Sequence, residues 1–137
     1  MPDGLAHTLG RHHVRPRYQD LFNAMKDSDP VRADEAFDAV LFDRAQAVPD
    51  LIEAYTLFKD DLLLRWNTVQ LLGFSGSSKA VKTLIEALND PEPRVRAEAC
   101  RSLEDLKAKA AVDALRARLT DVDPDVRQAA QEALQRI

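Results

Sequence analysis

Apolar positions in the second half of the chain follow a helical spacing. Between residues 81 and 88 they stand at i, i+3, i+4 and i+7, which is the pattern of one buried helix face. These residues are Val81, Leu84, Ile85 and Leu88. A second apolar stripe follows after a proline-containing turn, at Val95, Ala99, Leu103 and Leu106. The pattern predicts two consecutive amphipathic helices.

The two stripes recur with a period of 31 residues. Residues 81–106 laid over 112–137 share nine identities in 26 positions, mostly at apolar or turn sites. The same pattern recurs earlier in the chain. Residues 48–54 match 81–87 at an offset of 33, and Arg65 and Leu72 match Arg96 and Leu103 at an offset of 31. Residues 20–32 match more weakly. We therefore predict an N-terminal arm, 1–16, followed by a single repeat domain, 17–137. The domain should contain four units, at about 17–46, 47–78, 79–109 and 110–137.

Each unit is expected to be a pair of helices. Asp29-Pro30, Glu92-Pro93 and Asp123-Pro124 mark the start of a second helix, because an acidic residue caps well and proline suits the first helical position. No segment alternates with period two, so we predict no sheet. Since one short helix pair cannot bury both of its stripes, the pairs must stack. The sequence predicts an all-α fold, an α-solenoid of about four helix pairs and about eight helices.

The motif Ala80-Val81-x-x-Leu84-Ile85-x-Ala87-Leu88-x-Asp90, followed by Pro93-x-Val95-Arg96-x-x-Ala99, resembles HEAT repeats. The resemblance is to the short HEAT-like class named after phycobilisome lyases, and it weakens toward the N-terminus. Leu72-Gly73 matches a dipeptide common in the family, whereas Leu103-Glu104 and Leu134-Gln135 depart from it. The resemblance implies an armadillo-like, right-handed solenoid whose second helices line a concave groove. It indicates the fold more than the function.

Acidic and basic residues repeat at fixed positions of the units. Arginines begin the second helices and aspartates lie in the turns; they are Arg65, Arg96 and Arg127, and Asp90 and Asp121. One interpretation is a row of arginines for an acidic ligand. We favour a structural ladder in which each arginine bonds turn groups of its own or a neighbouring unit, because repeats reuse structural residues.

Five large apolar residues fall at positions of the second helices that should face the groove. They are Phe37, Leu41, Leu63, Trp66 and Phe74. Such a patch on a soluble protein indicates a partner-binding surface, for which aromatic side chains are the usual anchors. Two alternatives stay open. The N-terminal segment, with Leu5, Leu9, Val14 and Tyr18, covers the patch, or the first unit is rotated and our register there is wrong.

Composition and charge limit the classes of function. The chain has 137 residues, of which 45% are hydrophobic and 31% charged, and this indicates a globular domain that we expect to be cytoplasmic. It has one cysteine, Cys100, and no apolar run long enough to span a membrane. The net charge is -4, and a basic segment 1–17 precedes an acidic body. We therefore do not expect a nucleic-acid partner.

Candidate catalytic and metal-binding chemistry is sparse. The three histidines, His7, His12 and His13, are poorly spaced to share one ion, and no serine occupies a nucleophile-elbow motif. We expect no metal site, no cofactor and no catalytic residues.

The sequence favours a non-catalytic scaffold that binds an unidentified protein or peptide in its groove. The first alternative is a subunit associated with an enzyme, similar to bilin lyases. A weaker alternative is a HEAT-like protein of DNA repair that binds nucleic acid. No further helix is expected to cover Leu115, Leu119 or Ile137 in the last unit, so we also consider a homodimer through the C-terminal repeat, with a two-fold contact as the default.

Overall fold

The computed structural model describes residues 14–137, which form eight α-helices and three short 3-10 turns. The α-helices are α2 (Pro16–Ala24), α3 (Pro30–Phe42), α4 (Val48–Leu57), α5 (Leu62–Phe74), α6 (Val81–Ala87), α7 (Pro93–Asp105), α8 (Val112–Ala117) and α9 (Pro124–Arg136). The 3-10 turns are η1 (Ser78–Ala80), η2 (Lys109–Ala111) and η3 (Arg118–Thr120). Residues 14–137 contain no strand.

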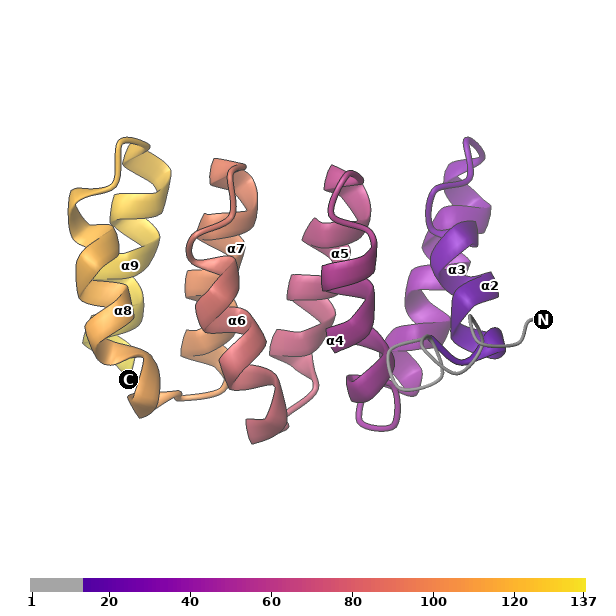
Figure 1. Ribbon diagram of the computed structural model, residues 1–137, viewed down its shortest axis with the longest axis horizontal. Coiled ribbons are helices and arrows are strands. Elements are labelled where there is room, and N and C mark those ends of the chain that lie inside the picture. Colours follow the sequence, from indigo (N-terminus) through magenta and orange to yellow (C-terminus); the bar gives the residue numbers. More distant parts are fainter. Residues whose placement is uncertain (1–13) are drawn as a thin grey trace, which may run out of the picture.

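The helices are arranged as four pairs in a row, from the N-terminal to the C-terminal end (Figure 1). Helices α2, α4, α6 and α8 form one layer, which we call the first-helix layer. Helices α3, α5, α7 and α9 lie behind them and form the second-helix layer (Figure 1). Helix α7 packs on both α5 and α9, so the units stack through their second helices. The predicted α-solenoid of four helix pairs is confirmed.

Acidic residues and prolines define where the second helices begin. The side chain of Asp29 accepts a hydrogen bond from the Val31 amide, and that of Asp123 accepts from the amides of Asp125 and Val126. Proline follows both caps at the first helical position. The expectation for Glu92 is wrong in one respect. It occupies the N-cap position of α7, but its side chain makes no capping bond.

The first helices of the third and fourth units are short. A 3-10 turn leads into α6 and another leads into α8. The side chain of Ser77 accepts a hydrogen bond from the Lys79 amide and so caps the first of these turns. The apolar stripe nevertheless continues across the junction, because Ala80 and Leu84 are both fully buried.

Small residues let the second helices approach closely. Ala99 and Ala130 are fully buried between neighbouring units. A methyl group added at Gly73 would lie 2.4 Å from Oγ and 2.8 Å from Cα of Ser102 on α7. The Ser102 hydroxyl donates a hydrogen bond of 3.0 Å to the carbonyl of Val69. Glycine is therefore required at Gly73 by space rather than by backbone conformation.

The first unit is joined to the second by a different set of contacts. Helix α3 packs less extensively on α5 than α5 packs on α7. Arg15, just before α2, donates from its backbone amide and its guanidinium to the buried carboxylate of Asp50, at 2.7 and 2.6 Å. Val14 is also buried. The end of the predicted arm therefore packs on the repeats, while residues 1–13 lie outside the described part of the chain.

Candidate functional site

The repeated arginines and aspartates make paired contacts between neighbouring units. The Arg65 guanidinium on α5 donates to both carboxylate oxygens of Asp90 in the next unit, at 2.9 and 3.1 Å. Its remaining amino group bonds the carbonyl of Lys59. The Tyr55 hydroxyl donates to the same Asp90 carboxylate, at 2.7 Å. We call this set of contacts and its repeat in the next unit the Arg–Asp ladder.

The next step of the Arg–Asp ladder has the same geometry. Arg96 donates to both oxygens of Asp121, at 3.0 Å each, and to the carbonyl of Asp90, at 2.8 Å. Arg127 donates to the carbonyl of Asp121, at 2.7 Å, and its side chain has no carboxylate partner among residues 14–137. The arginine, the aspartate and the carbonyl that accepts from the arginine recur 31 residues apart in the two complete steps, whereas Tyr55 has no counterpart in the second step.

Charge in the Arg–Asp ladder is compensated. The side chains of Arg65 and Arg96 are only 9% and 10% exposed, and both aspartates are buried. Burial alone would raise the pKa of Asp90, but the hydrogen bonds from Arg65, the Glu92 amide and Tyr55 hold it below its usual value. The pKa of Asp121 is lowered in the same way. These arginines are therefore engaged within the fold and are not free to bind an acidic ligand.

The outward side of the second-helix layer carries the apolar residues singled out in the sequence. We call this side the second-helix face. On α5 the stripe runs through Leu63, Trp66 and Phe74. Leu63 and Phe74 are 43% and 42% exposed, and Trp66 is partly buried against the core. The three side chains share one side of the helix because they are three and eight residues apart.

The residues predicted on the first unit lie deeper. Phe37 and Leu41 on α3 are both partly buried and pack against the core. Phe42, at the end of the same helix, was not among the predicted residues and is 88% exposed. The Arg44 guanidinium bonds the carbonyl of Phe74, at 2.8 Å, and so holds the ends of α3 and α5 together. The run Val40-Leu41-Phe42 was the available signal, because a helix cannot bury three consecutive side chains on one face.

A cleft of about 220 Å³ lies beside Trp66, between α5, α7 and the start of α9. Its lining is Trp66, Pro93, Arg94, Ala97, Glu98, Arg101, Asp123 and Asp125. The Trp66 indole N–H donates to the Glu98 carboxylate, at 3.3 Å. Burial raises the pKa of Glu98, while Arg101 and the indole lower it in part. The cleft thus offers an aromatic wall and charged groups of both signs.

The N-terminal segment was one candidate cover for this face. Tyr18 and Val14 are buried. The Tyr18 ring stacks on Phe22 within α2, and its hydroxyl donates to Asp43, at 3.1 Å. Leu5 and Leu9 lie outside the described residues. Over residues 14–137, the exposed side chains of Leu63 and Phe74 have no cover.

The C-terminal unit has an open hollow of about 600 Å³ on its outer side, between Leu119 and the residues of α9 from Pro124 to Gln135. Leu119 is 40% exposed and Ile137 is partly buried, whereas Leu115 is fully buried within its unit. The homodimer considered above would use this surface and stays a prediction.

Other candidate chemistry finds no site in the described part of the chain. No group of three or more His, Cys, Asp or Glu side chains there could hold a metal ion. All three histidines lie outside it. Cys100 is fully buried, and burial raises the pKa of its thiol to about 12, so the reactive thiolate is scarce. None of the described helices is long and apolar enough to cross a membrane.

Comparison with solved structures identifies a similar fold. Human deoxyhypusine hydroxylase in complex with glycerol matches with a TM-score of 0.67 and 21% sequence identity. The match covers 96% of this chain and 46% of that chain, so this chain spans less than half of its length. At this identity the likeness concerns the fold alone. No curated protein sequence matches.

A family model described as HEAT repeats matches residues 48–135. The matched segment contains the complete Arg–Asp ladder and the second, third and fourth units. The narrower resemblance to the phycobilisome-lyase class stays a prediction. The chain belongs to the HEAT-repeat family.

Proposed function

We propose that this chain is a non-catalytic interaction module that holds an apolar segment of a protein partner on its second-helix face. The observation that carries the proposal is the position of Trp66. Its ring forms one wall of the cleft toward α7, and Leu63 and Phe74 stand exposed on the same side of α5. Large apolar side chains of this kind are the residues that contribute most to protein interfaces.

The surroundings of Trp66 suit a binding anchor. The bond to Glu98 fixes the orientation of the indole, so little side-chain entropy remains to be lost when a partner binds. The Arg–Asp ladder holds neighbouring units together at the N-terminal ends of α5 and α7, which is the end where Trp66 lies. A cleft between two helices of fixed spacing is therefore available before the partner arrives.

Selection from a random peptide library displayed on phage tests the proposal. We expect enriched peptides to bind the wild-type protein and to lose at least about tenfold in affinity with Trp66→Ala. Leu57→Ala is the matched control, because Leu57 is 46% exposed but lies at the end of α4 in the first-helix layer and does not line the cleft. Binding to that variant should not change.

Leu63→Ser and Phe74→Ser provide a second route if Trp66→Ala alters the fold, because both side chains are largely outside the core. Circular dichroism and thermal unfolding establish that each variant is folded. The proposal fails if no peptide is enriched, or if the enriched peptides bind the Trp66 and Leu63 variants as well as the wild type.

A further inference from the structure

We infer that the segment bound on the second-helix face is cationic as well as apolar. The inference rests on the proposed function and adds the chemical class of the partner. It is based on how the charged residues are distributed between the two layers and on which of them already have partners.

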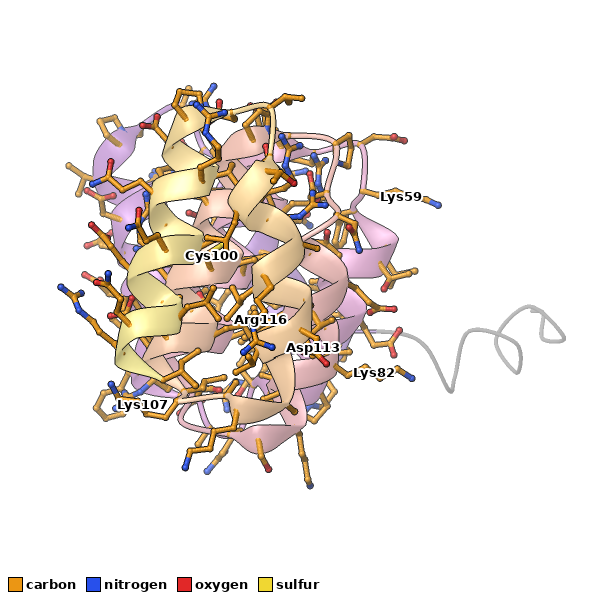
Figure 2. All side chains as sticks on the ribbon, turned by 90° about the vertical axis from the view of Figure 1, so that its left-hand side faces the viewer. Lys59, Lys82, Cys100, Lys107, Asp113 and Arg116 are labelled. Atoms are coloured by element: carbon orange, nitrogen blue, oxygen red, sulfur yellow. The ribbon has the colours of Figure 1, made fainter. Side chains whose placement is uncertain are left out.

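Lysines are excluded from the second-helix layer. All six lysines of the chain lie in the first-helix layer or in turns, at positions 26, 59, 79, 82, 107 and 109. Figure 2 shows the molecule from its C-terminal end, and there Lys59 and Lys82 extend on the side of α8, away from α9. Lys59 and Lys82 are therefore directed away from the proposed binding surface, whereas Lys107 donates to the carbonyl of Arg136 at the end of α9, at 3.0 Å.

The arginines on the second-helix face are paired with neighbouring carboxylates. Arg94 lies 3.7 Å from Glu92 and Arg101 lies 3.9 Å from Glu98. Arg136 bonds Glu104 of the preceding unit, at 3.1 Å. These three arginines thus each have a carboxylate neighbour within the fold, whereas Arg127 on α9 bonds only the carbonyl of Asp121.

Several carboxylates on the same face lack such a partner. Asp34 on α3, Asp105 on α7, and Asp125 and Glu132 on α9 form no ion pair with any residue in 14–137. Asp125 lines the cleft beside Trp66. Burial and the nearby Glu104 raise the pKa of Asp105, and Lys107 lowers it in part.

The uncompensated charge on the second-helix face is therefore negative, and it lies on both sides of the apolar stripe of α5. A partner with acidic side chains would be repelled, and one with lysines or arginines beside its apolar anchor would be attracted. Because these carboxylates are exposed, the attraction acts mainly on the association rate and is screened by salt.

Two synthetic amphipathic peptides test this inference directly. They share one apolar face containing tryptophan and leucine, and their polar faces carry either lysines or glutamates. We expect the lysine peptide to bind the wild-type chain at least about tenfold more tightly at low salt, measured by fluorescence anisotropy, and the advantage to shrink at about 0.5 M salt.

Charge-reversal variants locate the effect. Asp125→Lys with Glu132→Lys should remove the preference for the lysine peptide. The matched control, Glu86→Lys with Asp113→Lys, changes the net charge equally on α6 and α8, and Asp113 lies on the side of α8 in Figure 2. That control should retain most of the preference.

Equal binding of the two peptides, or equal loss of the preference in both double variants, would overturn the inference. If library peptides bind through Trp66 without a cationic preference, the charge inference fails and the proposed function stands. If neither synthetic peptide binds and no library peptide depends on Trp66, both fail.

Discussion

The junction between the first and second units differs from the two junctions that follow it. Units two to four are connected by the Arg–Asp ladder, in which each arginine bonds an aspartate 25 residues later. At the first junction the contacts are Arg15 to Asp50 and Lys26 to Asp61, and the side chains of Arg15 and Lys26 are 54% and 38% exposed. The later junctions are thus held by buried ion pairs, whereas the arginine and the lysine at the first junction are partly exposed to solvent.

The same contrast appears in the packing between second helices. Gly73 and Ser102 permit a close approach of α5 to α7. At the equivalent positions of the first junction, counted from the starts of the helices, stand Leu41, which is partly buried, and Leu71, which is fully buried. Larger side chains at these positions hold α3 further from α5. The apolar residues of the second-helix face are concentrated beside this irregular junction.

Breaking the Arg–Asp ladder should produce the largest loss of stability. Asp90→Ala leaves the Arg65 guanidinium buried without its carboxylate, and breaking a buried pair in this way costs about 3–5 kcal/mol. Lys26→Ala at the first junction should cost no more than about 1 kcal/mol, because that pair is partly exposed. Urea unfolding of both variants measures the difference. Similar losses would remove the distinction between the two junctions.

Filling the space at Gly73 should cause the next largest loss in the free energy of unfolding. In Gly73→Ala the added methyl group meets Ser102, including its backbone, so overpacking should cost about 1–3 kcal/mol. Thermal unfolding measures the loss. Ser102→Gly in the same chain should restore part of it, because it removes the two nearest atoms. Unchanged stability of Gly73→Ala would show that α5 and α7 are further apart than described.

Acid should weaken the ladder junctions. The pKa values of Asp90 and Asp121 are lowered in the folded chain, so their contribution to stability is present above the unfolded value and is lost as pH falls below about 4. The free energy of unfolding of the wild type should therefore fall more steeply on acidification than that of Asp90→Asn with Asp121→Asn. Parallel pH curves would contradict the lowered pKa values.

The smallest effect concerns Thr68, on the buried side of α5. Its hydroxyl oxygen is buried and has no hydrogen-bond partner in the described residues, and the equivalent residues of α7 and α9 are Ala99 and Ala130. Thr68→Val keeps the shape and removes the unpaired hydroxyl, so it should raise the free energy of unfolding by about 1 kcal/mol. A lower value in urea unfolding would indicate that the hydroxyl has a partner.

The regular part of this fold was predictable because its stabilising residues repeat. The period of 31 residues identified the helix pairs, and the recurring arginines and aspartates indicated a ladder within or between units, which the structure forms between units at Arg65–Asp90 and Arg96–Asp121. Contacts outside the repeat register were not predictable in this way. The bond of Arg15 to Asp50 joins two residues with no equivalent in the later units, and Tyr55 bonds Asp90 from a position where the third and fourth units have Leu88 and Leu119.

The outward-facing side chains of the candidate site were predictable on α5 but less so on α3. Leu63, Trp66 and Phe74 lie at outward positions because the landmarks on α5 align without gaps with those on α7. In our alignment the first unit is one residue shorter than the later units. Phe37 and Leu41 pack against the core, whereas Phe42 is 88% exposed. The side chains that are buried between α3 and α5 depend on the distance between the two helices, and a local sequence pattern does not determine that distance.

Chemical-shift mapping of the ¹⁵N-labelled chain with the lysine peptide tests the central proposal most directly. We predict that the largest amide shifts, and the shift of the Trp66 indole N–H, occur along the second-helix face at α5, α7 and the start of α9. Shifts confined to the first-helix layer, or an unchanged Trp66 indole signal at saturating peptide, would contradict it.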